Sequence, residues 1–195
     1  MGVSAVSAAK TSIVKPSSDP FAAVREATLK HRASHGCSAY PYDNGALLGA
    51  LAASANARRV LELGTALGYT ALWLAKGAPE AVVDTIEGDG EHARLAREHI
   101  EAHGLGGHIV VHEGEFAEVL RQLDPGYDVA FFDGSAPTRA LLKEMRRLLR
   151  ARGLLISANL THAGAEGYLA ALQEKKSWLT AFIDEEHETA LSIKL

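Results

Sequence analysis

The stretch Val60-Leu61-Glu62-Leu63-Gly64-Thr65-Ala66-Leu67-Gly68-Tyr69-Thr70 decides the fold. Its first four residues form an apolar run around one glutamate, which is typical of a buried strand, and a helical pattern begins at Tyr69. The glycines between them let the backbone take a positive φ and approach a ligand closely, while the helix start offers free N–H groups. The segment is therefore a ligand-binding turn or, in the simpler interpretation, a tight strand-to-helix turn without a ligand.

Short apolar runs alternate with helical patterns on both sides of this turn. Strands are expected at Arg59–Leu63, Ala81–Glu87, His108–His112, Tyr127–Asp133 and Gly153–Ala158. Helices are expected at Phe21–Ser34, Asn44–Ser54, Tyr69–Lys76, Asp89–His103, Glu115–Leu123, Thr138–Ala151 and Ala165–Lys175. This alternation predicts βαβ units and a parallel sheet, and the nearly continuous apolar strands predict helices on both of its faces.

The end of the chain has a different pattern. The apolar runs Trp178–Ile183 and Glu188–Leu195 are separated only by the polar turn Asp184–His187. A link this short permits only an antiparallel pair. The predicted fold is therefore α/β, a doubly wound sheet of five parallel strands followed by a C-terminal antiparallel hairpin.

Composition limits the possible function classes. The chain has 195 residues, 47% hydrophobic and 23% charged, which is ordinary for one globular domain. Residues 1–18 are rich in Ser and Ala and are expected to be a mobile N-terminal arm on a single domain over 19–195. The net charge of −4 argues against a broad nucleic-acid surface. A single cysteine, Cys37, suggests a reducing, cytoplasmic compartment, and no apolar run is long enough to span a bilayer.

Polar residues follow the other predicted strands at the edge of the sheet where ligands bind. Glu87 ends the second strand, 19 residues after Gly68 (87 − 68), where an acid can accept hydrogen bonds from both ribose hydroxyls. The segments Glu113–Phe116, Asp133–Ser135 and Asn159–His162 follow the next three strands. Each can also be read as a solvated strand end or a helix cap. The spacing Gly64-x-x-x-Gly68 differs from the dinucleotide pattern G-x-G-x-x-G, which counts against an NAD site.

Together these segments resemble the class I S-adenosylmethionine-dependent methyltransferases. Within that superfamily they look most like the small O-methyltransferases related to catechol and caffeoyl-CoA O-methyltransferases. The resemblance runs from about Phe21 to Leu195, and its motifs are Val60–Thr70, Thr85-Ile86-Glu87 and His112-Glu113-Gly114-Glu115. It implies a Rossmann-like sheet and the cofactor S-adenosyl-L-methionine. The family usually has aspartate where this chain has Glu115.

The resemblance also implies roles for individual residues. The cofactor-binding residues would be Glu62, Gly64, Thr65, Gly68, Tyr69, Thr70, Glu87, Glu115, Phe116 and Asp133. The residues of the glycine turn would hold the methionine end, with Glu62 near its ammonium and Thr70 near its carboxylate. Glu87 would hold the ribose, Glu115 and Phe116 the adenine, and Asp133 would lie near the sulfonium. The loop Ser38–Tyr42 would close over the cofactor.

The residues expected to carry out catalysis, after the fourth and fifth strands, depart from the pattern that the resemblance implies. Metal-dependent members have a lysine three residues after the aspartate of the fourth strand and an Asp-Asn pair ending the fifth. This chain has Ala136 and the pair Ala158-Asn159 instead. Asp133 and Asn159 alone would make a weak Mg²⁺ site, because Mg²⁺ relies on carboxylate oxygen, and metal use is doubtful. His162 is then a candidate general base, beside the plainer interpretation of an exposed loop histidine.

Three functions remain open from the sequence. The first is metal-independent methyl transfer from S-adenosylmethionine to the oxygen of a small-molecule acceptor, with Asp133, Asn159 and His162 as catalytic residues. The second is a catalytically silent relative that binds S-adenosylmethionine or S-adenosylhomocysteine, and the third, less favoured, is an NAD-dependent oxidoreductase. A homodimer is expected from the family, with the apolar helix Asn44–Ser54 as one contributor. Nucleic acid and membrane partners are not expected.

Overall fold

The computed structural model describes residues 19–195, so the expected arm at residues 1–18 lies outside the described residues. The helices are α1 Ala22–His35, α2 Gly45–Ser54, α3 Tyr69–Gly77, α4 Gly90–Ala102, α5 Phe116–Gln122, α6 Arg139–Leu148 and α7 Glu166–Leu172. The strands are β1 Arg59–Leu63, β2 Val82–Glu87, β3 Ile109–Glu113, β4 Tyr127–Phe132, β5 Leu149–Ser157, β6 Trp178–Phe182 and β7 Ala190–Lys194. No helix among these residues is long and apolar enough to cross a membrane.

The strands form one seven-stranded sheet in the order β3-β2-β1-β4-β5-β7-β6. Strands β1 to β5 are parallel, and β7 pairs antiparallel with both β5 and β6. The predicted α/β class, with its parallel strands and terminal hairpin, is therefore confirmed. The strand order reverses between β1 and β4, which is the switch point where open α/β sheets bind ligands.

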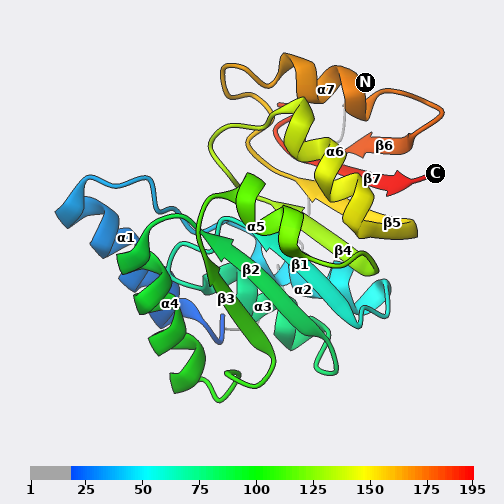
Figure 1. The fold of residues 1–195 in the computed structure, drawn as a ribbon. Helices are drawn as coiled ribbons and strands as arrows, with labels where there is room; N and C mark the ends of the chain where they lie inside the picture. The colour runs from blue at the N-terminus through cyan, green and yellow to red at the C-terminus, as the bar shows by residue number, and fades with distance from the viewer. Residues whose placement is uncertain (1–18) are drawn as a thin grey trace, which may run out of the picture.

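Two hydrophobic cores cover the two faces of the sheet, because neighbouring residues of a strand point to opposite faces. On β4, Val129 and Phe131 belong to one core with α1 to α4, while Ala130 and Phe132 belong to the other with α5 to α7. The molecule thus has three layers, with α5, α6 and α7 on one side of the sheet and α2 and α3 on the other (Figure 1).

The expected helix Thr138–Ala151 and the strand start at Gly153 were wrong. Helix α6 ends at Leu148, and β5 already begins at Leu149, which pairs with Tyr127 of β4. The ladder is irregular between Tyr127 and Val129, and Arg152 takes a φ of 62°. Pairing with β4 therefore overrides the helical preference of this segment, which is a tertiary effect.

The helices α2 and α3 pack at very short range through glycines. A Cβ atom on Gly77 would lie 1.9 Å from the carbonyl oxygen of Gly49, and one on Gly45 would lie 2.1 Å from the Trp73 ring. These positions exclude any larger residue unless the helices separate. One face of the expected interface helix is therefore already used within the chain, and Leu48 and Ala52 on it are fully buried.

Candidate active site

The glycine turn lies at the switch point between β1 and α3. Gly64 and Gly68 have φ angles of 101° and 95°, and Ala66 between them has a φ of 45°. A Cβ atom on Gly64 would lie 3.1 Å from the backbone oxygen of Asp133, so the turn also fits closely against the end of β4. Gly64 therefore cannot carry a side chain without disturbing the end of β4, and the turn leads directly into α3.

Glu87 connects the end of β2 to this turn. Its carboxylate accepts hydrogen bonds from the backbone N–H of Ala66 at 2.8 Å and of Asp89 at 3.0 Å. A carboxylate can accept about four hydrogen bonds, so its remaining lone pairs stay available to hydroxyl donors. The structure thus places the predicted ribose acid directly against the predicted cofactor turn.

Glu62 is a fully buried carboxylate in the middle layer of the molecule. Its Oε2 accepts a hydrogen bond of 2.6 Å from the hydroxyl of Thr85, which in turn lies 2.6 Å from the Thr65 hydroxyl. Its Oε1 has no hydrogen-bond partner among residues 19–195. Burial raises the pKa of Glu62 to about 8, although the nearby hydroxyls of Thr70 and Thr85 oppose that rise.

Asp133 follows β4 and is the second carboxylate at the switch point. The side-chain amide of Asn159 donates to Asp133 Oδ1 at 3.0 Å and to the carbonyl oxygen of Gly134 at 3.2 Å. Burial raises the pKa of Asp133 to about 7, against the lowering effect of the Asn159 hydrogen bond. None of the ion pairs within residues 19–195 involves Glu62 or Asp133. A buried acid, Glu62, and a partly buried acid, Asp133, without a cation make this edge of the sheet suited to a positively charged ligand.

The predicted adenine contacts, Glu115 and Phe116, follow β3. Glu115 is exposed at the start of α5, and its Oε1 would lie 3.8 Å from a Cβ atom on Gly88. Phe116 is half-buried, and its ring would lie 2.8 Å from a Cβ atom on Gly134. Gly134 is therefore required for the ring to lie over the chain after β4. Both residues face the same edge as Glu87.

Two predicted site residues lie apart from these groups. Tyr69 is buried, and its hydroxyl donates to Asp19 Oδ2 at 2.9 Å, lining a cavity of about 570 Å³ between α1, α2 and α3. Its side chain is thus committed to the helix layer, although its backbone starts α3. His162 is exposed on the loop between β5 and α7, where its backbone N–H bonds the carbonyl of Asn159 at 3.2 Å.

The loop after α1 approaches the site from the other side. The Tyr42 ring meets Phe131 edge-on at 5.4 Å between centroids, and its hydroxyl lies 3.5 Å from that of Thr189. Burial raises the pKa of Tyr42, and the charge of Asp133 acts in the same direction. Neither Thr189 nor Thr85 was among the predicted site residues, although Thr85 lies in a motif of the family resemblance. Thr85 had a signal, since a hydroxyl inside an apolar strand needs a partner.

The residues present do not fit the Mg²⁺ site expected of metal-dependent relatives. Asp133 is the only carboxylate of the expected ligand set, since Ala158 is buried where an aspartate would stand. The amide of Asn159 turns its nitrogen toward Asp133 and the Gly134 carbonyl, which leaves a donor where a cation needs an oxygen. Ala136, in place of the expected lysine, is exposed.

A cationic methyl donor fits the site better. S-adenosylmethionine carries an ammonium and a sulfonium, and the unpartnered Oε1 of Glu62 and the partly buried Asp133 are acceptors without a cation. The positive φ angles of Gly64 and Gly68 favour glycine at both positions of the turn beside these acids. The site therefore provides counter-charges for such a ligand.

Known proteins show the same fold and the same family. The family described as O-methyltransferase matches residues 10–178. Catechol O-methyltransferase from Mycobacterium tuberculosis is 33% identical over 123 residues, covering 62% of this chain and 56% of that protein. Catechol O-methyltransferase from Niastella koreensis is 30% identical over 128 residues, covering 63% of this chain and 58% of that protein. The matched part thus spans little more than half the length of these relatives.

Solved structures show the fold independently. The crystal structure of an O-methyltransferase from Bacillus cereus, in complex with S-adenosylhomocysteine, has a TM-score of 0.76 and covers 94% of each chain at 23% identity. The sequence match from residue 10 to residue 178 accounts for most of the chain and includes the turn, both acids and Asn159. The chain therefore belongs to the O-methyltransferase family.

Proposed function

We propose that this protein transfers a methyl group from S-adenosylmethionine to a hydroxyl of a small-molecule acceptor, without a divalent metal. The observation that carries the proposal is the pair of carboxylates without a cation beside the glycine turn, Glu62 fully buried and Asp133 partly buried. Ionising such an acid away from water is costly without a partner, and a bound cation would offset that cost at both carboxylates. Membership of the O-methyltransferase family supports the reaction type.

The proposed cofactor-binding residues are those given in the sequence analysis. Glu62 would face the ammonium and Thr70 the carboxylate of the methionine end, beside Gly64, Thr65 and Gly68. Tyr69 would contribute its backbone alone, because its hydroxyl is held by Asp19.

The other end of the cofactor has its own proposed partners. Glu87 would accept from the ribose hydroxyls while it keeps the turn in place through Ala66. Glu115 would accept from the adenine amino group, and Phe116 would lie against its base. These residues follow β2 and β3, beside the strand that carries the turn, so one edge of the sheet would serve the whole ligand.

When bound, S-adenosylmethionine supplies an electrophilic methyl group, so the chain has to bind, orient and deprotonate the acceptor. Asp133 is proposed as the group that takes the acceptor proton, since a carboxylate with a pKa of about 7 is a competent base near neutral pH. Asn159 is a positioning residue that orients Asp133 through its amide. His162, exposed on the adjoining loop, would accept the proton and pass it to solvent.

A second function is favoured by one observation. Ala136 and Ala158 remove the lysine and one of the acids expected from metal-dependent relatives, so a silent binder of S-adenosylmethionine or S-adenosylhomocysteine is the alternative. The two functions share the cofactor site and differ in turnover. A nicotinamide cofactor is disfavoured by the spacing of Gly64 and Gly68.

The first experiment is calorimetric titration with S-adenosylhomocysteine in the presence of a chelator, repeated with added Mg²⁺. Micromolar binding that Mg²⁺ leaves unchanged supports the metal-independent site. Release of S-adenosylhomocysteine is then followed with phenols, catechols and aliphatic alcohols as acceptors. Turnover in chelator supports methyl transfer, cofactor binding without turnover of any acceptor supports the silent relative, and no binding overturns both.

Two variants test the proposed path of the proton. Asp133→Asn should abolish turnover while S-adenosylhomocysteine still binds, and His162→Ala should lower turnover without changing S-adenosylhomocysteine affinity. The proposal also includes a homodimer in a cytoplasmic compartment with no nucleic-acid partner. Light scattering at micromolar concentration tests the dimer, and a monomer mass would contradict it.

A further inference from the structure

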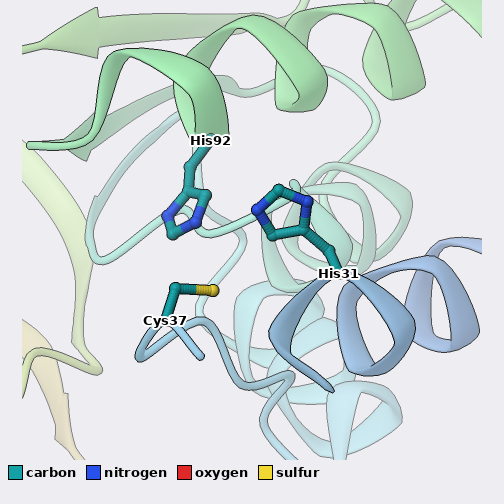
Figure 2. Close-up of side chains that lie close together, drawn as sticks. All are labelled: His31, Cys37 and His92. Atoms are coloured by element: carbon teal, nitrogen blue, oxygen red, sulfur yellow. The ribbon is translucent and has the colours of Figure 1, made fainter. Parts of the chain in front are cut away.

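Two histidines and one cysteine from separate parts of the chain lie close together outside the site described above. His31 is near the end of α1, Cys37 is on the loop that follows it, and His92 is in the first turn of α4. One ligand atom of each lies within 4.8 Å of the ligand atoms of the other two. Figure 2 shows the two imidazole rings side by side, with the Cys37 sulfur directed toward the space between them. We propose that His31, Cys37 and His92 bind a divalent transition-metal ion, most favourably Zn²⁺.

The distances allow such an ion after a small movement. Zn–N and Zn–S bonds of about 2.0 and 2.3 Å place tetrahedral ligand atoms about 3.3–3.7 Å apart. The group, at 4.8 Å or less, therefore has to contract by about 1 Å. Cys37 can supply this movement, because it follows Gly36, which ends α1 in a left-handed conformation with nothing near its Cβ position.

His92 is the fixed member of the group. It is buried, and Asp89 caps its helix by accepting from the backbone N–H of Glu91 at 2.9 Å and of His92 at 3.1 Å. Its Nδ1 lies 3.8 Å from Oε1 of Glu87. Ligation through Nε2 would therefore leave Nδ1 facing a carboxylate, the arrangement that orients many zinc-binding histidines.

The donor set decides the class of ion. Two imidazoles and one thiolate suit Zn²⁺ and its softer neighbours, whereas Mg²⁺ requires oxygen ligands. The three residues leave a fourth tetrahedral position, which water can occupy. Bound to all three residues, the ion would cross-link α1 and the loop after it to the start of α4. It is distinct from the Mg²⁺ site of metal-dependent relatives and does not depend on the proposed methyl transfer.

The alternative to metal binding is that the three side chains only pack against one another. Its ring stacks on His35 at 4.3 Å between centroids and meets His92 edge-on at 5.1 Å. Packing alone would hold the three groups without any metal. Cobalt(II) distinguishes the two cases, because a Co²⁺–thiolate bond gives a near-ultraviolet charge-transfer band and tetrahedral Co²⁺ gives intense visible bands. Cys37 is the only cysteine of the chain, so the sulfur band identifies the site even though nine histidines are present.

The experiment titrates the reduced, chelator-treated full chain with Co²⁺ and then displaces it with Zn²⁺. The expected result is one tetrahedral, sulfur-bonded Co²⁺ per chain, displaced by Zn²⁺ but not by Mg²⁺, with a higher melting temperature in Zn²⁺. Cys37→Ser should remove the charge-transfer band, and His31→Gln should weaken Zn²⁺ binding by about 100-fold or more, since even outer partners of ligands cost about 10- to 100-fold.

The matched control is His108→Gln, which changes an exposed histidine before β3 and should leave the spectrum unchanged. Circular dichroism and S-adenosylhomocysteine binding check that each variant is folded. A Co²⁺ spectrum without the sulfur band, or one that survives in both Cys37→Ser and His31→Gln, overturns the proposal. Because the readout is the metal spectrum, it fails or succeeds independently of methyl transfer.

Discussion

The buried carboxylate of Glu62 predicts an unusual dependence of stability on pH. Its pKa in the folded chain is about 8 against an ordinary 4.5. Between these values the folded state holds a proton that the unfolded state has released, so the free energy of unfolding falls as pH rises. The ligand-free protein should therefore be more stable at pH 5.5 than at pH 8. Asp133, with a pKa of about 7 against 3.8, acts in the same direction.

The size of the effect follows from the same two pKa values. About 1.4 kcal/mol is lost per pH unit between them, so burying Glu62 costs about 3 kcal/mol at pH 7 and ~5 kcal/mol above pH 8. The side chain has 0% exposure, so solvent screening does not reduce this figure much. Glu62→Gln removes the titration and should remove this part of the slope.

The assay is urea denaturation of the ligand-free chain at several pH values between 5.5 and 8.5, for the wild type and Glu62→Gln. The difference between their free energies of unfolding should change by about 3 kcal/mol across this range. Glu118→Gln, an exposed glutamate on α5, is the control and should give a constant difference. Saturating S-adenosylhomocysteine should flatten the wild-type curve, because its ammonium favours the ionised carboxylate.

A constant difference between the wild type and Glu62→Gln across the whole range would refute the reasoning. It would mean that the carboxylate is ionised in the folded state without a bound cation. The absolute stability of Glu62→Gln does not decide the matter, because the new amide also needs a hydrogen-bond partner. Only the dependence on pH reports the titration.

Three further predictions concern other residues of the site. Glu87→Gln should weaken S-adenosylhomocysteine binding about tenfold or more in calorimetry, since hydrogen bonds to a charged group contribute about 1.5–3 kcal/mol; an unchanged affinity would remove Glu87 from the ribose site. Gly134→Ala should lower stability by about 1–3 kcal/mol in urea, because its Cβ atom would lie 2.8 and 2.9 Å from two aromatic carbons. Gly167→Ala, with nothing within 4 Å, is its control and should not be destabilised. Ala158→Asp adds a carboxylate beside Asp133 and should create weak Mg²⁺ binding that the wild type lacks; equal Mg²⁺ heats would contradict the reading of this site.

The parallel sheet could be predicted because its signals are local. The run Arg59–Leu63 is mostly apolar and is followed by a glycine turn, and the strand has the same bounds in the structure. The end of the helix at 138–151 could not be predicted in this way. Leu149 pairs with Tyr127 across the sheet, and this pairing depends on residues more than 20 positions away.

The candidate site was predictable only in its position. Because parallel strands end at one edge, Glu87, Asp133 and Asn159 had to meet near the glycine turn, and the structure brings them there. Which of these acids lacks a partner depends on the surrounding side chains. Tyr69 is an example of a side-chain orientation that the sequence could not give. Its place in the motif predicted a cofactor contact, whereas in the structure its hydroxyl donates to Asp19.

The sequence by itself determined the succession of strands and helices along the chain, the glycine turn, and the absence of the expected lysine and second acid. Each of these depends only on residues that are neighbours in the sequence. Only the tertiary structure decided that Glu62 keeps an unpartnered oxygen, that Asn159 turns its amide nitrogen to Asp133, and that Cys37 meets two histidines. Burial, hydrogen bonding and ligand geometry depend on distances between residues far apart in the chain, and folding alone sets those distances.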